Sequence, residues 1–368
     1  MHILHVVGAR PNFVKAAPVL HAFTREARIS QTLVHTGQHY DVSMSDVFFR
    51  QLNIPEPDVN LRVGSSSHAQ QTAEIMVRLE PVILERSPDW VMVYGDVNST
   101  VAAALVCAKL LVRVAHVEAG LRSFDRTMPE EINRLVTDQL ADLLLTPSCD
   151  GNENLLREGI APEKISLVGN LMIDTLVRLL PEARAHRLPE LPERYVLVTL
   201  HRPANVDDGV FLRGLLDTLH EIGRSLPVIF PVHPRTRQRV ADFGLPEGGS
   251  DHMRLTNPLS YLEFLALQER ATLVITDSGG IQEETTFLGV PCLTIRENTE
   301  RPITTTIGSN VLVGRDLRRL REEILRILSG SRLPTRVPPL WDGHAAERTV
   351  TEVLHRRALQ ERSVLAEV

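Results

Sequence analysis

The acidic residues with the clearest potential for chemistry lie in the first half of the chain, at or near the ends of apolar runs. They are Asp96, Glu118 and the adjacent pair Glu130 and Glu131. Carboxylates that meet at one place can act as general acid and general base, because burial and mutual repulsion separate their pKa values. A structural role is the alternative. Asp96 and Glu130 could cap the helices that follow them, and Arg122 or Arg134 could be their ion-pair partners.

Basic residues also gather at loops. They are Arg10 and Lys15 in the first loop, His201 and Arg202, His233 and Arg235 in two later loops, and Arg301 near the last. In an acidic chain, this placement indicates groups that line a phosphate-binding cleft. His201 and His233 directly follow apolar runs, which favours a functional role, whereas His116 lies inside such a run and is interpreted as a core histidine.

The segment 277–284, Asp-Ser-Gly-Gly-Ile-Gln-Glu-Glu, has the pattern of a phosphate-binding turn. It follows the apolar run 273–276 and opens an amphipathic helix. Two glycines let the backbone approach a ligand, and the first N–H groups of a helix are free to bind an anion. Glu283 and Glu284 lie one turn further on, where a carboxylate could accept hydrogen bonds from sugar hydroxyls. Plain helix capping by Asp277 or Ser278 is the competing interpretation.

These polar clusters are positioned by a repeated pattern of short apolar strand, polar loop and amphipathic helix. The predicted strands are residues 3–7, 34–36, 90–94, 112–117, 143–146, 195–200, 228–232, 273–276 and 291–295. Alternating strands and helices of this size predict parallel βαβ units of the α/β class, with ligands at the carboxyl ends of the strands.

Two domains are expected, because 368 residues exceed the usual limit of about 250–300 residues for a single core. Residues 181–192 contain three prolines and no strand pattern, which predicts a linker or surface excursion before the strand pattern restarts. We place an N-terminal domain at 1–172 and a C-terminal domain at 173–350. A C-terminal helix at about 351–368 is expected to pack back on the first domain.

Composition excludes several classes of function. A net charge of −6 and a pI near 6.2 argue against general affinity for nucleic acid or anionic membranes. The N-terminus lacks a leader pattern and no apolar run approaches ~18 residues, so a cytoplasmic protein is expected. There is no Walker loop, dinucleotide fingerprint or closely spaced Cys/His pair for zinc. Acid–base chemistry on a phosphorylated ligand, without metal or cofactor, is what remains.

Taken together and in order, the motifs resemble those of the non-hydrolysing UDP-N-acetylglucosamine 2-epimerases. They are residues 8–15, 36–39, 95–96, 116–122, 129–134, 168–170, 201–203, 277–284 and 299–302. The resemblance implies two Rossmann-like domains of glycosyltransferase-B type, a UDP-sugar bound in the cleft between them, and a homodimer.

The resemblance also implies roles for individual residues. Asp96, Glu118 and Glu130 match the catalytic acids, with Glu131 as a weaker candidate, and His201 joins the catalytic set. Phe264 should lie against the uracil and Glu284 should bind the ribose. Ser278, Gly279 and Gly280 should hold the diphosphate, helped by Arg10 and His201. The remaining substrate-binding candidates are Lys15, Arg134, His233 and Arg301.

The family reaction removes the proton at C2 of the sugar and expels UDP, which gives a bound 2-acetamidoglucal. UDP then re-adds, with protonation from the opposite face. For this chain the resemblance implies interconversion of UDP-GlcNAc and UDP-ManNAc. The sequence does not assign the base and the acid among the carboxylates.

Two departures from the family pattern bear on the substrate. Ala204 stands where many members have a glutamate after the His-Arg motif, and residues 40–46 lack the glutamine-bearing loop of members activated by a second UDP-GlcNAc. We therefore expect no such activation, and a variant 2-acetamido sugar becomes more plausible. A hydrolysing 2-epimerase, a glycosyltransferase and a UDP-sugar sensor are the alternative functions.

Overall fold

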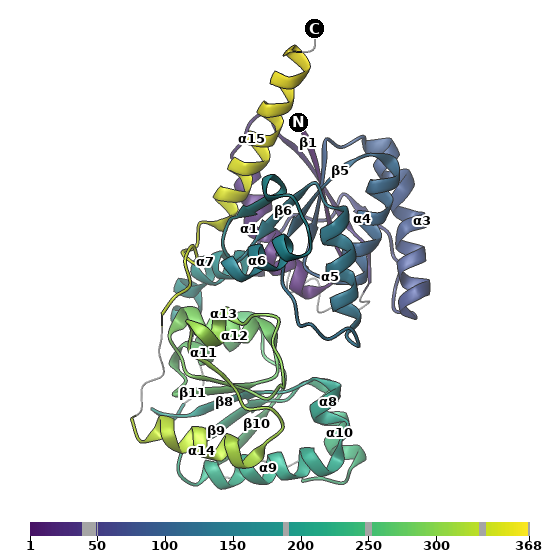
Figure 1. The fold of residues 1–368 in the computed structure, drawn as a ribbon. Helices are drawn as coiled ribbons and strands as arrows, with labels where there is room; N and C mark the ends of the chain where they lie inside the picture. Colours follow the sequence, from purple (N-terminus) through teal and green to yellow (C-terminus); the bar gives the residue numbers. More distant parts are fainter. Residues whose placement is uncertain (39–48, 50, 187–190, 247–251, 331–335, 367–368) are drawn as a thin grey trace. The chain divides into compact units, whose positions relative to one another are not determined.

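The computed structural model describes residues 1–38, 49, 51–186, 191–246, 252–330 and 336–366. The chain forms two compact units, each an α/β structure (Figure 1). The first unit contains Met1–Thr175 and Pro339–Val368, and the second contains Leu176–Pro338. None of the described helices is both long enough and apolar enough to cross a membrane.

The first unit is built on a parallel sheet with strand order β3-β2-β1-β4-β5-β6-β7. Its strands are β1 (His2–Val7), β2 (Ser30–His35), β3 (Val59–Asn60), β4 (Trp90–Tyr94), β5 (Arg113–Val117), β6 (Leu143–Thr146) and β7 (Ile165–Leu167). The helices are α1 (Arg10–Phe23), α3 (His68–Arg86), α4 (Asn98–Leu110), α5 (Pro129–Leu140), α6 (Cys149–Arg157), the 3₁₀ helix η1 (Pro162–Lys164) and α15 (Ala345–Ala366).

The second unit repeats this arrangement with strand order β10-β9-β8-β11-β12-β13. Its strands are β8 (Val196–Thr199), β9 (Val228–Pro231), β10 (Met253–Thr256), β11 (Leu273–Thr276), β12 (Cys292–Thr294) and β13 (Asn310–Leu312). The helices are α8 (Pro203–Val206), α9 (Gly209–Gly223), α10 (Pro234–Asp242), α11 (Tyr261–Arg270), α12 (Gly279–Leu288), α13 (Ile303–Thr306) and α14 (Leu317–Leu328).

Both sheets carry helices on both faces, which is why their central strands are continuous apolar runs. In the first unit, α3 and α4 cover one face through residues such as Ile75, Leu79 and Ala103. In the second unit, α9 and α14 cover one face, and the other face packs on side chains of α11 and α12. All five residues of β4 are buried, as are all four of β11.

Each sheet has one point where the direction of the strand order reverses. This switch point lies between β1 and β4 in the first unit and between β8 and β11 in the second. In doubly wound sheets, the loops at the carboxyl ends of these two strands diverge and leave a crevice for ligands. Among the polar residues singled out in the sequence, Asp96 follows β4, His201 follows β8 and Ser278 follows β11.

The predicted linker at 181–192 is wrong in its first part. Helix α7 (Leu171–Ala185) runs through Pro181, and the residues after it at 187–190 lie outside the described chain. Leu179 and Ala183 on either side of this proline are buried. Their packing offsets the hydrogen bond that proline removes from a helix.

The C-terminal helix α15 packs against α1 of the first unit. The carboxylate of Asp174, on α7, accepts hydrogen bonds from the Ala345 and Ala346 N–H groups at 3.0 and 2.7 Å. This carboxylate supplies the cap that the start of α15 requires. Just before the helix, Trp341 donates its indole N–H to the Pro147 carbonyl at 2.9 Å.

A matched pair of glycine substitutions should separate backbone strain from steric clash. Gly120 and Gly159 have φ values of +80° and +81°, but an added Cβ would lie 2.5 Å from the Gly151 carbonyl oxygen only at Gly120. At Gly159, nothing lies within 4 Å. Gly159→Ala should therefore cost about 1–2 kcal/mol of unfolding free energy, for the left-handed backbone alone. Gly120→Ala should cost about 1–3 kcal/mol more, measured by urea unfolding. Equal losses would contradict the close packing of the loop after β5.

Candidate active site

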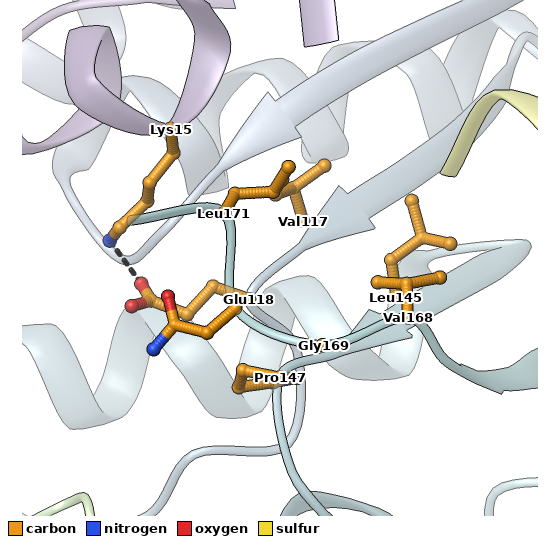
Figure 2. Close-up of a pocket in the computed structure, with 9 residues that line it drawn as sticks. Lys15, Val117, Glu118, Leu145, Pro147, Val168, Gly169 and Leu171 are labelled. Atoms are coloured by element: carbon orange, nitrogen blue, oxygen red, sulfur yellow. Dashed lines mark hydrogen bonds and ion pairs between the residues drawn. The ribbon is translucent and has the colours of Figure 1, made fainter. Parts of the chain in front are cut away.

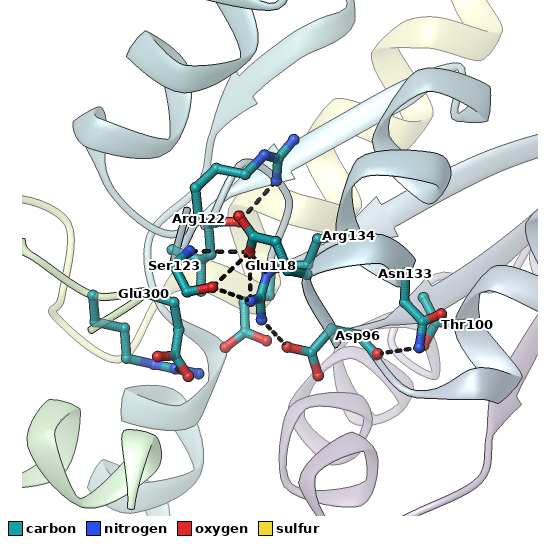
Figure 3. Close-up of polar contacts among 12 residues, drawn as sticks. Asp96, Thr100, Glu118, Arg122, Ser123, Asn133, Arg134 and Glu300 are labelled. Atoms are coloured by element: carbon teal, nitrogen blue, oxygen red, sulfur yellow. Dashed lines mark hydrogen bonds and ion pairs between the residues drawn. The ribbon is translucent and has the colours of Figure 1, made fainter. Parts of the chain in front are cut away.

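Asp96 follows β4 and is held by an arginine from α5 (Figure 3). The guanidinium of Arg134 forms a close ion pair with the Asp96 carboxylate. On its other edge, Arg134 donates from Nε and Nη2 to Oε2 of Glu131, at 3.0 and 2.6 Å. Arg134 is 2% exposed, so this bridge is fixed by burial. Asp96 therefore does not cap α4, and the ion-pair alternative is the one that the structure shows.

Glu131 anchors the loop that joins β5 to α5. It accepts hydrogen bonds from the Ser123 N–H at 3.0 Å and the Phe124 N–H at 2.9 Å. Burial acts to raise the pKa of Glu131, but these N–H groups and Arg134 outweigh it and hold the pKa below its ordinary value. The neighbouring Glu130 is exposed in the first turn of α5.

Glu118 directly follows β5 and forms a close ion pair with Lys15 of α1 (Figure 2). Glu118 has φ +71°, a left-handed conformation that is rare for a residue with a side chain. Both side chains are largely buried, at 5% and 8% exposure. They lie beside Gly95, where an added Cβ would be 3.0 Å from the Lys15 ammonium nitrogen. The two predicted residues thus meet beneath the turn that carries Asp96.

A small pocket opens next to this ion pair (Figure 2). Its polar lining comes from Lys15, Glu118 and Asn170. Its apolar lining comes from Val117, Leu145, Pro147, Val168 and Leu171. The carboxyl ends of β5, β6 and β7 therefore offer a small, mostly apolar recess in which Glu118 is the acidic group.

A buried carboxylate, Asp138 on α5, ties the strand ends together. It accepts from the His116 Nδ1 at 2.6 Å and from the Gly120 N–H at 3.1 Å, and pairs with Arg122 at 2.7 Å. The other ring nitrogen of His116 contacts the Gly95 carbonyl at 2.8 Å. Both ring nitrogens of His116 therefore have a polar partner. We call Asp138, His116, Arg122 and the Gly95 and Gly120 backbones the Asp138 cluster. It confirms that His116 is a core residue with satisfied hydrogen bonds.

The first loop is fastened by Asn12 of α1. Its Oδ1 accepts from the Gly8 and Ala9 N–H groups at 3.0 and 3.2 Å, and its Nδ2 donates to the Tyr94 carbonyl at 2.6 Å. Arg10, the first residue of α1, is half-buried beside this loop. The loops after β1 and β4 are therefore joined at the switch point.

In the second unit, Asp277 does not cap the helix that it precedes. Its buried carboxylate turns toward the loop after β8 and accepts from the Arg202 N–H at 2.9 Å and from Asn205 Nδ2 at 3.1 Å. Ser278 occupies the N-cap position of α12 but makes no capping hydrogen bond with its side chain. The N–H groups at the start of α12 thus keep their capacity to bind an anion. The capping alternative is wrong for both residues.

Arg301 lies against this helix start within a buried group of charges. An added Cβ on Gly279 would be 2.6 Å from Arg301 Nη1, which shows how closely the guanidinium approaches. Arg301 pairs with Glu283 at 2.9 Å and with Glu300 at 2.8 Å. Burial acts to raise the pKa of Glu300, but the Arg301 and Arg296 guanidinium groups hold it far below its ordinary value. Glu283 is thereby held in an ion pair with Arg301.

Glu284 has a different environment from Glu283. It is 2% exposed and accepts a hydrogen bond at 2.8 Å from the Tyr261 hydroxyl on α11. Burial, opposed by the Tyr261 hydrogen bond and helped by the Glu283 charge, raises the pKa of Glu284 to about 7. Phe264, one turn along α11 from Tyr261, is half-buried and packs on the adjoining apolar cluster.

The two predicted histidines of the second unit lie together. The His201 and His233 rings are 5.5 Å apart between centroids. His233 is the exposed N-cap residue of α10, and its Nδ1 accepts from the Arg235 N–H at 3.2 Å. His201 pairs through Nδ1 with Asp277 at 2.9 Å. The structure therefore brings His201, His233 and Ser278 to the switch-point edge of the second sheet.

Sequence reasoning missed the residues that hold the site together rather than form it. Asn12, Asp138 and Tyr261 all lie inside helices, where no loop or strand end draws attention to them. A polar residue on the apolar face of a predicted helix was the available signal for Asp138. The interpretation of residues 40–46 cannot be compared with the structure, because these residues lie outside the described chain.

The fold and these clusters define the class of the protein. Two doubly wound parallel sheets identify an α/β protein with two Rossmann-like domains of glycosyltransferase-B type. A lipopolysaccharide outer core galactosyltransferase that is 14% identical shares this fold with a TM-score of 0.58, over 97% of this chain and all of the other.

The comparisons with known proteins then show the family. The model of the UDP-N-acetylglucosamine 2-epimerase family matches residues 21–354. A UDP-N-acetylglucosamine 2-epimerase of Methanococcus maripaludis is 40% identical, over 95% of this chain and 97% of its own. A UDP-2,3-diacetamido-2,3-dideoxy-D-glucuronate 2-epimerase of Pseudomonas aeruginosa is 44% identical, over 85% and 88%.

Among solved structures, the Methanocaldococcus jannaschii UDP-GlcNAc 2-epimerase in complex with UDP-GlcNAc and UDP has a TM-score of 0.87. It is 39% identical and covers 96% of this chain and all of its own. The chain therefore belongs to the UDP-N-acetylglucosamine 2-epimerase family, a family of isomerases. The resemblance seen in the motifs is confirmed.

Replacing the central carboxylate of the Asp138 cluster should lower the free energy of unfolding. Asp138→Asn removes the buried carboxylate that contacts His116 and pairs with Arg122, and leaves Arg122 with Glu158 as its counter-charge, so the unfolding free energy at pH 7 should fall by about 3–5 kcal/mol. The measurement is urea unfolding, with the exposed Glu153→Gln as a control that should change little.

The same variant carries a pH dependence of definite sign. Burial acts to raise the pKa of Asp138, but His116 and Arg122 hold it below the ordinary value of 3.8. A depressed pKa stabilises the fold above the unfolded-state value, and this contribution is lost as pH falls through the folded-state value. The stability gap between wild type and Asp138→Asn should therefore narrow on acidification below about pH 4. A gap that widens instead would contradict the charge assignment.

Proposed function

We propose that this chain catalyses the reversible epimerisation at C2 that converts UDP-GlcNAc to UDP-ManNAc. The observation that carries the proposal is the pair of carboxylates at the ends of the adjacent strands β4 and β5. Asp96 and Glu118 lie there, and each is fixed by a cation, Arg134 and Lys15 respectively. Acid–base groups must be held in place if a C–H bond is to break, and buried ion pairs provide that rigidity.

The reaction needs one group to remove the C2 proton and another to return a proton from the opposite face. In the elimination, the electrons of the C2–H bond form the C1=C2 double bond of the 2-acetamidoglucal. The C1–O bond breaks, and its electron pair leaves on the diphosphate oxygen of UDP. Re-addition of that oxygen to C1, with protonation at C2 from the other face, gives the epimer. Asp96, Glu118 and the exposed Glu130 form the acid–base set of this proposal.

The second unit is proposed to hold the nucleotide. The free N–H groups after Ser278, at Gly279 and Gly280, would accept the diphosphate, with Arg301 behind them. His201 and His233 supply further donors. Glu284 would bind the ribose hydroxyls and Phe264 would lie against the uracil. Such groups stabilise the diphosphate when the bond to the sugar breaks.

A modified UDP-2-acetamido sugar is the second candidate substrate. The relative at 44% identity is named for a UDP-2,3-diacetamido-2,3-dideoxy-D-glucuronate, and the proposed chemistry at C2 is the same for both sugars. Ala204 also departs from the glutamate found there in many members. The two candidates differ at C3 and C6, so an assay with both UDP-sugars decides between them.

Turnover in D₂O tests the proposal directly. With wild type, deuterium should enter C2 of the recovered UDP-GlcNAc and UDP-ManNAc, because the proton that returns comes from solvent. Glu118→Gln should lower the rate of exchange by about 10²–10⁴-fold, whereas UDP affinity should stay within about tenfold, or 1.4 kcal/mol. NMR of the sugar C2 signals and calorimetry with UDP give the two readouts, and Glu153→Gln serves as the surface control.

Each outcome of that experiment has a meaning. Binding of UDP-GlcNAc and of the diacetamido sugar without any C2 exchange in wild type would overturn the epimerase proposal. Free UDP accumulating in step with turnover would instead identify a hydrolysing 2-epimerase. Unchanged exchange in both Glu118→Gln and Asp96→Asn would remove these carboxylates from the mechanism.

The raised pKa of Glu284 predicts how nucleotide affinity depends on pH. Ribose hydroxyls donate to the ionised carboxylate, so UDP-GlcNAc should bind more weakly as pH falls through about 7. Calorimetry at pH 6 and pH 8, in the Glu118→Gln background to prevent turnover, should show this trend. Adding Glu284→Gln should weaken binding at pH 8 by about tenfold and flatten the dependence.

Glu284→Gln should weaken nucleotide binding at pH 8 but stabilise the fold at that pH. A carboxyl with a raised folded-state pKa stabilises the fold below its unfolded-state pKa, and this is lost as pH rises through about 7. At pH 8, the variant should therefore melt at a higher temperature than wild type. A lower melting temperature at pH 8, with the surface variant Glu221→Gln unchanged, would show that Glu284 is not a buried charge.

A further inference from the structure

Asp277 directs all its described hydrogen bonds toward one loop, the loop that carries His201. The carboxylate is fully buried and accepts from the backbone N–H groups of His201 and Arg202, with distances of 2.9–3.2 Å. Asn205 adds a bond at 3.1 Å and also donates to the Ile295 carbonyl. Burial acts to raise the pKa of Asp277, but His201 and these donors hold it below its ordinary value. Asp277 is therefore an anion beneath this loop.

The strand register places this pair beside the start of α12. Thr199 of β8 pairs with Thr276 of β11 at the carboxyl ends of the two strands. His201 and Ser278 each lie two residues beyond this pair of threonines. The imidazole and the free N–H groups of α12 thus leave the sheet at the same edge, on the two sides of the switch point.

The contact with Asp277 also decides which ring nitrogen of His201 is available. The carboxylate can only accept, so the Nδ1 at 2.9 Å must carry a hydrogen. The nitrogen left for a ligand is Nε2, on a side chain that is 41% exposed. Without this contact, the imidazole could adopt either tautomer and rotate about its two side-chain bonds.

We propose that Asp277 is a positioning residue for the departure of UDP, acting through His201. This inference rests on the proposed epimerase function and adds a residue to it. Asp277 holds His201 with Nδ1–H turned inward, so that Nε2 faces the diphosphate at the α12 N-terminus. In the imidazolium form, for which Asp277 is the counter-charge, Nε2 also carries a hydrogen. When the C1–O bond breaks and its electron pair leaves on the diphosphate oxygen, this Nε2–H donates to that diphosphate. On re-addition the oxygen returns to C1 and Nε2 keeps its hydrogen.

The charges around His201 are compatible with this role. The His233 ring faces it at 5.5 Å, and Arg202 is the next residue along the chain. Arg202 in turn lies 3.7 Å from Glu300, which also pairs with Arg296 and Arg301. Asp277 is the acidic group in contact with the imidazole among the described residues, which makes its removal a specific test.

A double-mutant cycle separates this role from a purely structural one. Asp277→Asn should lower kcat for C2 epimerisation by about 10–100-fold, the usual effect of losing a group that orients a functional histidine, and KM should stay within about threefold. In a His201→Gln background, the same substitution should change kcat by less than about twofold. A full loss of kcat from Asp277→Asn in the His201→Gln background would overturn the proposal.

Asn205→Ser is the matched control for damage to the loop. It removes bonds to Asp277 and to Ile295 but leaves the contact between Asp277 and the imidazole. It should lower the melting temperature while kcat stays within about threefold. A fall in kcat as large as that of Asp277→Asn would show that the loop, and not the imidazole, is what Asp277 serves.

A measurement on the wild-type protein keeps the proposal testable if Asp277→Asn does not fold. ¹⁵N NMR of the histidine rings, with His201 identified by its loss in His201→Gln, should show a protonated Nδ1 between pH 6 and pH 8. An Nε2–H tautomer with bare Nδ1 would overturn the inference. This readout needs no turnover, so absence of C2 exchange in wild type would refute the epimerase proposal while the contact between Asp277 and a protonated Nδ1 is tested separately.

Discussion

The Asp138 cluster is the interaction on which the first unit depends. One carboxylate on α5 holds a histidine from β5, an arginine from the following loop and the Gly120 backbone, and through His116 it reaches Gly95. Removing one partner from such a buried set leaves an uncompensated charge, whereas the complete set is tolerated. The ends of β4 and β5, which carry Asp96 and Glu118, are therefore held by buried charges and hydrogen bonds as well as by packing.

In the second unit, a buried carboxylate also holds the loops at the ends of the strands. Loops at the carboxyl ends of parallel strands have few apolar contacts, and their N–H groups need partners. In the first unit Asp138 and Glu131 supply those partners, and in the second Asp277 does. In each unit, carboxylates outside the proposed acid–base set hold the backbone of loops that follow the strands.

The strands that could be predicted from the sequence are those whose residues are buried and therefore form a continuous apolar run. The central strands β4, β6 and β11 matched their predicted bounds because all their residues are buried. The strands left unpredicted, β3, β7, β10 and β13, are the four edges of the two sheets. They are two to four residues long and only partly buried, so they lack an apolar run. Site residues showed the same limit. Asp96, Glu118 and His201 follow strands and were predicted as site residues. Their ion-pair partners come from distant segments of the chain, as Asp277 does for His201. Sequence spacing does not reveal such pairs.

The left-handed backbone of Glu118 has a consequence for sorting related sequences. Glycine would adopt φ +71° freely, and a residue with a side chain forgoes about 1–2 kcal/mol there. Glycine would also leave the buried Lys15 ammonium without its ion-pair partner, which costs about 3–5 kcal/mol. Positions 15 and 118 are therefore expected to change together among related chains. Under the proposed function, homologues that carry out chemistry at C2 should keep both the lysine and the glutamate.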